Sequence, residues 1–175
     1  IPVFQAGRGW TQVTENPGRD FSGGGAMGKA SSFALGLAVA RPDLKVILLD
    51  GDGSLEMNLG SLVTIAERGP KNFYHFVIGN GVYATTGGQP ITGSGMVSFS
   101  GMAQNAGYAA SYEIDDLEDF ATSAEKIFSE DGPVLISAKT IPVIRTPEER
   151  ARQQAQQRAN PRRRTPADAM GELRD

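Results

Sequence analysis

Two short polar segments carry the residues of this sequence that could bind a metal ion and a phosphate group. Asp52 follows the apolar run at residues 45–50, and Asn80 follows the apolar run at residues 73–78. A run of large aliphatic residues without alternation is typical of a parallel strand covered on both faces. Because ligands bind beyond the carboxyl ends of such strands, we expect Asp52 and Asn80 to lie at one site. Carboxylate and amide oxygens are ligands that Mg²⁺ takes, and Mg²⁺ often bridges to phosphate.

The residues around Asp52 also favour an anion. Gly51 and Gly53 allow a sharp turn, and Ser54 can cap a helix that follows. The free N–H groups and the dipole at a helix N-terminus attract a negatively charged group. The segment therefore predicts a metal–diphosphate site. The same residues also fit a plain strand-to-helix turn and a left-handed Asn-Gly turn, and this alternative stays open.

The periodicity of apolar residues predicts the elements that position these segments. Small residues at helical spacing predict a thin helix at residues 27–40, and Gly69-Pro70 ends the helix that Ser54 begins. The expected strands are residues 3–5, 45–50, 73–78, 111–114 and 134–139, the other helices are residues 102–106 and 117–128, and residues 7–25 and 79–95 are expected to be loops. This alternation predicts an α/β fold with a doubly wound, mostly parallel sheet and helices on both faces.

Composition excludes several classes of site. The chain has 175 residues and no Cys, which excludes disulfides, thiolate nucleophiles and iron–sulfur clusters. The longest apolar runs are too short to cross a bilayer, and the first residues do not resemble a signal peptide, so we expect a cytoplasmic protein. A net charge of −3 gives no general signal for nucleic acid. The single histidine, His75, lies in an apolar run and is expected to be a core or edge residue.

The C-terminal residues differ in composition from the rest. Residues 145–175 hold eight Arg against five acidic residues, and their large apolar residues are Met170 and Leu173 alone. So polar a segment can bury little surface. We therefore expect a ligand-binding domain at residues 1–144 and an Arg/Gln-rich tail at residues 145–175 that is a frayed helix or disordered.

The polar motifs resemble those of thiamine diphosphate enzymes. The shared pattern is Gly-Asp-Gly, an Asn 28 residues after the Asp, and then a Tyr. The resemblance implies that Asp52, Asn80 and the main-chain carbonyl of Val82 hold Mg²⁺. The family often has paired Asn residues, and Gly79 replaces the first of them here. The second residue of the pair, which is the ligand, is retained.

The resemblance also implies which residues bind the cofactor, thiamine diphosphate. Residues 24–28 (GGAMG) are similar to the glycine-rich loop of the family. Met27 would prop the cofactor in its bent conformation, and the Gly25 carbonyl would accept from its amino group. Met27 could instead be an ordinary core residue. The implied cofactor-binding residues are Gly25, Met27, Gly51, Gly53, Ser54, Tyr83 and Thr85.

Two longer segments make the family resemblance more specific. GDGSLEMNLGSL and TGGQP are similar to the β-subunit of sulfopyruvate decarboxylase and to the matching half of phosphonopyruvate decarboxylase. The polar loop at Thr85, Thr86 and Gln89 could bind an anionic substrate group or be an ordinary loop stabilised by Ser/Thr turns. The resemblance implies a decarboxylase that acts on a small anionic 2-oxo acid.

The activating glutamate of this family lies on a separate pyrimidine-binding domain. The resemblance therefore implies a second, pyrimidine-binding (PYR-type) subunit that brings this Glu, and hence a hetero-oligomer. No catalytic residue is assigned on this chain, and neither nucleic acid nor a membrane is expected as a partner. Two alternatives stay open. One is a carboligating enzyme similar to acetolactate synthase, and the other is a catalytically silent scaffold of the same fold.

Overall fold

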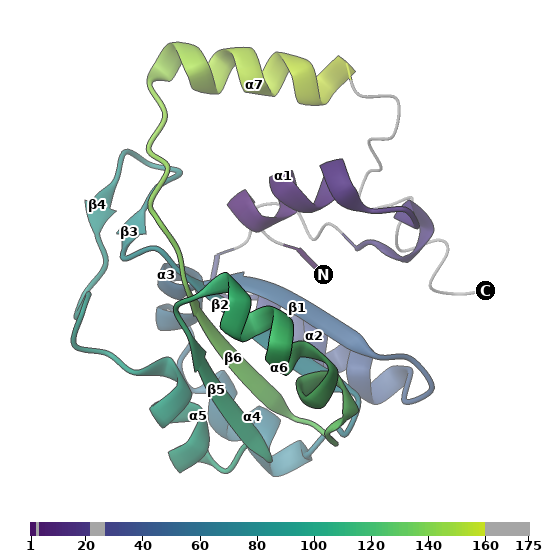
Figure 1. Ribbon diagram of the computed structural model, residues 1–175. Helices are drawn as coiled ribbons and strands as arrows, with labels where there is room; N and C mark the ends of the chain where they lie inside the picture. Colours follow the sequence, from purple (N-terminus) through teal and green to yellow (C-terminus); the bar gives the residue numbers. More distant parts are fainter. Residues whose placement is uncertain (3, 22–26, 160–175) are drawn as a thin grey trace.

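The computed structural model of the chain describes residues 1–2, 4–21 and 27–159. Its centre is a four-stranded parallel sheet in the order β1-β2-β6-β5 (Figure 1). The strands are β1 (Val46–Gly51), β2 (Phe73–Gly79), β5 (Ala110–Ile114) and β6 (Val134–Lys139). The non-consecutive neighbours require crossover connections, as expected for a doubly wound sheet. The predicted α/β fold and all four of these strands are confirmed.

The register between β1 and β2 brings the two polar segments together. Asp50 pairs with Val77, and Gly51 pairs with Ile78. The chain after β1 and the chain after β2 therefore leave the sheet at the same edge. Asp52 and Asn80, the first residues beyond the two strands, are placed side by side by this register.

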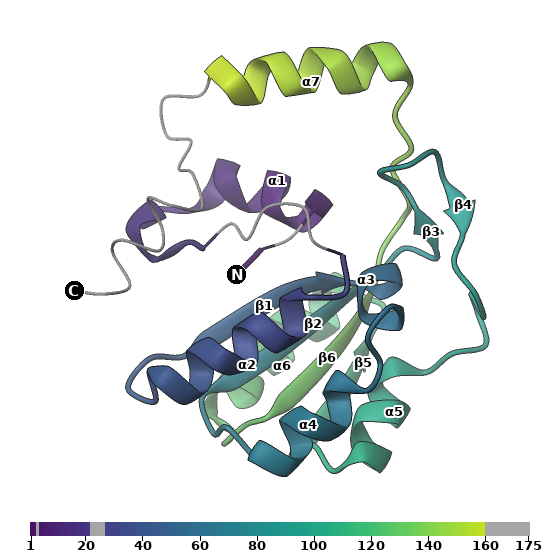
Figure 2. The same cartoon turned by 180° about the vertical axis from the view of Figure 1, so that it is seen from behind.

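Helices cover both faces of the sheet. Figure 2 shows α2 (Ala30–Ala40), α4 (Ser61–Arg68) and α5 (Phe99–Ala106) on one face, and Figure 1 shows α6 (Leu117–Ser129) on the other. The buried residues of α2 are all small, which allows the close packing predicted for this helix. The first core contains Leu48, Leu62, Ile65, Phe73, Val77, Phe99 and Leu135, and the second contains Tyr74, Phe76, Ile127, Val134 and Ile136.

The N-terminal prediction is wrong in two places. Residues 4 and 5 begin the helix α1 (Phe4–Val13), where a strand was expected, and Val3 lies outside the described residues. A helix followed by a 3₁₀ turn (Pro17–Arg19) replaces most of the expected loop. Gly7 and Gly9 weaken the helical signal in this segment. The space beside Gly7 is needed, because a Cβ there would lie 3.2 Å from the Pro2 carbonyl oxygen.

The helix predicted from Ser54 to Arg68 is instead two helices. The first is α3 (Asp52–Glu56), with Gly51 as its N-cap, and the second is α4. Ser54 does not cap, because its hydroxyl accepts a hydrogen bond from the Gly28 N–H at 3.2 Å. Gly69 ends α4 in the left-handed conformation (φ 55°), as predicted.

Two other segments are more ordered than expected. The loop at 79–95 contains an antiparallel pair of short strands, β3 (Val82–Tyr83) and β4 (Gln89–Pro90). Helix α5 starts three residues before the predicted start, because Ser98 caps it by accepting from the Gly101 N–H.

The C-terminal tail contains the helix α7 (Pro147–Ala159), and the rest of the tail lies outside the described residues. A domain boundary at residue 144 stays a prediction. Within the described parts of the chain, no helix is long and apolar enough to span a membrane.

Candidate functional site

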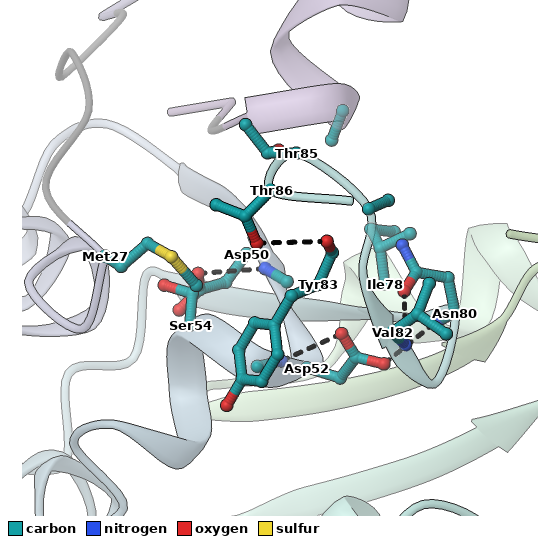
Figure 3. Close-up of a pocket in the computed structure, with 14 residues that line it drawn as sticks. Met27, Asp50, Asp52, Ser54, Ile78, Asn80, Val82, Tyr83, Thr85 and Thr86 are labelled. Carbon is teal, nitrogen blue, oxygen red and sulfur yellow. Dashed lines mark hydrogen bonds between the residues drawn. The ribbon is translucent and has the colours of Figure 1, made fainter. Parts of the chain in front are cut away.

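A pocket lies at the carboxyl ends of β1 and β2 (Figure 3). Of the residues predicted to form a site, it brings together Met27, Gly51, Asp52, Gly53, Ser54, Asn80, Val82, Tyr83 and Thr85. Gly25 lies outside the described residues. The lining residues that sequence reasoning did not assign to the cofactor or the metal are Ala6, Asp50, Ile78, Ala84 and Thr86.

Asp52 joins the two polar segments. The residue is 3% exposed, and its Oδ2 atom accepts from the N–H groups of Asn80 at 2.8 Å and Gly81 at 2.7 Å. Its Oδ1 atom accepts from the Gly53 N–H at 2.8 Å. Hydrogen bonds to an ionised acceptor are stronger than neutral ones. Asp52 therefore fixes the turn after β1 against the turn after β2.

The oxygens near Asp52 fit a hard divalent cation. The Asn80 Oδ1 atom accepts from the Val82 N–H at 2.9 Å, and the Val82 carbonyl accepts from the Ala84 N–H at 2.9 Å. Each of these two oxygens has two lone pairs and uses one, and the Asp52 carboxylate uses three of about four. All three groups thus keep acceptor capacity for a metal ion.

Of the three candidate metal ligands at this site, Asp52 is the charged one. No group of three or more His, Cys, Asp or Glu side chains that could hold a metal ion occurs among the described residues. An ion held by Asp52, Asn80 and the Val82 carbonyl would take its other ligands from water or a bound anion. Mg²⁺ in particular keeps several waters and binds through one or two carboxylates plus phosphate. The residues present therefore fit Mg²⁺ bound to a diphosphate.

Gly53 is packed beneath the ring of Tyr83. A Cβ at this position would lie 2.5 Å from the Tyr83 Cε1 atom and 3.1 Å from the Ile91 Cγ2 atom. The absence of a side chain thus lets the loop that contains β3 close over the turn after β1. Tyr83, which lines the pocket, owes its position to this contact.

We expect Gly53→Ala to weaken cofactor binding by about tenfold or more while the sheet stays folded, because Tyr83 must move out of its place over the turn. Calorimetric titration with thiamine diphosphate and Mg²⁺ would measure the change. Gly60→Ala is the matched control, since Gly60 has a helical φ of −58° and open space around its Cβ position. Equal affinities of the two variants would contradict the role assigned to Gly53.

The sequence over residues 7–138 matches the family described as "Thiamine pyrophosphate enzyme, C-terminal TPP binding domain". The chain belongs to this family. It is 42% identical over 112 residues to phosphonopyruvate decarboxylase of Streptomyces hygroscopicus, which covers 64% of this chain and 27% of that enzyme. It is 40% identical over 124 residues to sulfopyruvate decarboxylase subunit beta of Methanocaldococcus jannaschii, which covers 71% of this chain and 65% of that subunit.

A solved structure shows the same fold. The thiamine diphosphate-dependent 4-hydroxybenzoylformate decarboxylase of Rhodococcus jostii RHA1 has a TM-score of 0.57 and 27% identity, and the match covers 66% of this chain and 23% of that chain. The chain spans less than two thirds of the length of each of these three relatives. The family resemblance inferred from the sequence is confirmed.

Within this thiamine diphosphate-binding domain, Asp50 was not predicted as a site residue. It is 1% exposed and lines the pocket, and its Oδ1 atom accepts from the Gly51 N–H at 2.9 Å. Its Oδ2 atom lies 3.6 Å from the Nε2 atom of His75, which is fully buried. The Nδ1 atom of His75 lies 3.4 Å from the Tyr108 hydroxyl. His75 is thus a core residue, as expected, and it connects the floor of the pocket to the protein interior.

Burial also affects two groups near the domain's site. Desolvation raises the pKa of the Tyr108 hydroxyl, which keeps it protonated beside His75. Desolvation, and then the charge of Asp52, raises the pKa of Glu56 in α3. Neither residue lines the pocket, so neither is a candidate for direct contact with the cofactor.

The Thr-rich loop that follows Asn80 is largely bonded to itself. The Thr86 hydroxyl lies 3.1 Å from the Gln89 Oε1 atom and 3.3 Å from the Tyr83 carbonyl, and the Gln89 Nε2 atom donates to the Thr86 carbonyl at 3.3 Å. Thr85 and Thr86 line the pocket, whereas Gln89 does not. For Gln89, these contacts favour the turn-stabilising role over contact with a ligand.

Proposed function

We propose that this chain is the diphosphate-binding subunit of a thiamine diphosphate- and Mg²⁺-dependent decarboxylase. Its substrate is a small 2-oxo acid with a second anionic group, as in sulfopyruvate or phosphonopyruvate. The observation that carries the proposal is the buried Asp52 carboxylate, which is bonded to the Asn80 and Gly81 N–H groups at the carboxyl ends of β1 and β2. The names of the two relatives at 40% and 42% identity support the reaction and the substrate class.

Each pocket residue has a proposed part in holding the cofactor. Asp52, Asn80 and the Val82 carbonyl hold Mg²⁺, and Gly51, Gly53 and Ser54 surround the diphosphate. Met27 props the cofactor in its bent conformation, the Gly25 carbonyl accepts from its amino group, and Tyr83 and Thr85 cover it from the opposite loop. When bound, the cofactor takes up the electron pair released as carbon dioxide leaves, while the protein supplies position and electrostatics.

The activating glutamate is proposed to come from a second chain. The acidic residues that line the described pocket are Asp50 and Asp52, and no glutamate is among the lining residues. The relative from Methanocaldococcus jannaschii is named as a subunit, which favours a partner of the pyrimidine-binding type. The complete site would then lie at the interface of a hetero-oligomer.

The proposal is tested on the complex purified from the source cells. We expect mass spectrometry to find a second chain of similar size together with thiamine diphosphate. We also expect carbon dioxide release from sulfopyruvate or phosphonopyruvate that stops when Mg²⁺ is chelated and resumes when it is restored. The chain without its partner is the control and should release none. A chain isolated alone without cofactor would favour a silent scaffold, and acetolactate formed from pyruvate would favour a carboligase.

A further inference from the structure

The charges that line the pocket do not suit a substrate with two anionic groups. The charged side chains among the described lining residues are Asp50 and Asp52, and both are acidic. A metal ion at Asp52 would be shared with the cofactor diphosphate. A second anionic group on the substrate therefore requires a cation that the lining residues of β1 and β2 do not provide.

Helix α7 brings a cation to the rim of the pocket. The Arg150 Nη1 atom donates to the carbonyl of Thr85, a lining residue, at 3.2 Å. The two residues are 65 positions apart in the sequence. Figure 1 shows α7 beyond the loop that contains β3 and β4, on the side of the sheet edge where the pocket lies.

The Arg150 guanidinium has N–H donors that remain available for a ligand. Its Nε atom is buried and has no hydrogen-bond partner among the described residues, and none of the ion pairs between described residues includes Arg150. A guanidinium has five N–H donors in a planar fork that matches the oxygens of a carboxylate or phosphate group. Sulfonate and phosphonate oxygens have similar spacing and charge.

The position of Arg150 is fixed by its neighbours. Thr146 and Glu149 cap the start of α7 reciprocally, since the Thr146 N–H donates to Glu149 Oε2 at 2.8 Å and the Glu149 N–H donates to Thr146 Oγ1 at 3.3 Å. Before the helix, Ile144 packs onto Gly88, where a Cβ would lie 2.4 Å from the Ile144 Cδ1 atom. The segment that carries Arg150 therefore contacts the loop after Asn80 at two residues, Thr85 and Gly88.

We propose that Arg150 determines specificity by binding the second anionic group of the substrate, at the rim of the pocket beside Thr85. This inference rests on the proposed decarboxylase function. It gives the tail a function, because α7 would supply the charge by which the enzyme selects a sulfonated or phosphonated 2-oxo acid over pyruvate.

The test compares Arg150→Gln with Arg152→Gln in the complete complex. Arg152 lies on the same helix and is exposed, and its replacement makes the same change in net charge. Neither arginine is among the lining residues, but Arg150 is hydrogen-bonded to one of them, Thr85. For the anionic substrate, we expect Arg150→Gln to raise KM by about 10- to 100-fold, because it removes a charge-assisted contact. We expect no change in KM for pyruvate, partial recovery in Arg150→Lys, and no effect of Arg152→Gln.

A binding measurement accompanies the kinetics. Calorimetry with an unreactive three-carbon sulfonate should show the same loss of affinity in Arg150→Gln as the change in KM. Equal effects on the anionic substrate and pyruvate would overturn the proposal in favour of a clamp that only holds the loop, as would no effect on either. If the wild-type complex decarboxylates neither anionic acid, the proposed substrate class fails before any variant is compared, and the role of Arg150 fails with it.

Discussion

Replacing Asp52 by Asn is expected to lower the affinity for thiamine diphosphate by about 100-fold or more at low-millimolar Mg²⁺. The substitution removes the single charged ligand proposed for the metal ion, and each 1.4 kcal/mol lost is a factor of ten in affinity. It also places an amide beside the N–H groups of Asn80 and Gly81, which the carboxylate now accepts from. Calorimetric titration of the complex with cofactor at fixed Mg²⁺ measures the loss.

The same substitution is expected to destabilise the fold, and the two effects can be separated. A hydrogen bond to a charged group contributes about 1.5 to 3 kcal/mol, so the free energy of unfolding should fall by at least this amount. A lost metal ligand can be partly offset by more Mg²⁺, whereas a distorted turn cannot. We therefore expect affinity for the cofactor to rise as Mg²⁺ is increased in Asp52→Asn. Asp119→Asn, on the exposed surface of α6, is the matched control. Wild-type affinity in Asp52→Asn would contradict the metal assignment.

The part of the site that the sequence predicts correctly is the part that follows from local pattern and sheet geometry. Two apolar runs predict parallel strands, and parallel strands bring their carboxyl ends to one edge. The Oδ2 atom of Asp52 accepts from the Asn80 N–H, as that geometry requires. A glycine at residue 53 is also needed, but for packing, because a close contact with Tyr83 leaves no space for a side chain.

The errors arise where a tertiary contact overrides a local preference. Ser54 is a good N-cap residue by type, but its hydroxyl is taken by the Gly28 N–H, and Gly51 caps α3 instead. Helix α1 has two glycines that lower its intrinsic propensity, and it forms beside Pro2, which bridges to Leu49. Local sequence carries no signal for either contact.

Polar contacts between residues far apart in the sequence could also not be predicted. His75 is separated from Asp50 by 25 positions, and Arg150 from Thr85 by 65. No periodicity or motif links the members of either pair. Asp50 did offer a weak signal, since an acidic residue at the end of an apolar run must find a partner if it is buried. The identity of that partner required the structure.

Replacing His75 by Leu is expected to lower the free energy of unfolding by about 1 to 3 kcal/mol, because the buried Asp50 side chain, whose Oδ2 atom lies 3.6 Å from His75 Nε2, would lose a polar neighbour. Asp50 would then keep the Gly51 N–H as its donor, in a site that is 1% exposed. Denaturant unfolding measures the loss. Leu135→Met is the matched control, since Leu135 is paired with His75 in the sheet and a change that conserves volume costs less than about 1.5 kcal/mol.

A double-mutant cycle separates the pair from ordinary packing. If the His75 Nε2 and Asp50 Oδ2 atoms interact at 3.6 Å, the double variant Asp50→Asn/His75→Leu should lose about 1 to 3 kcal/mol less than the sum of the single losses. The reason is that Asp50→Asn removes the buried carboxylate that His75→Leu would leave without its polar neighbour. Strictly additive losses would show that His75 contributes only its volume to the core. A coupled result would establish that the floor of the pocket is held by a polar contact to the protein interior.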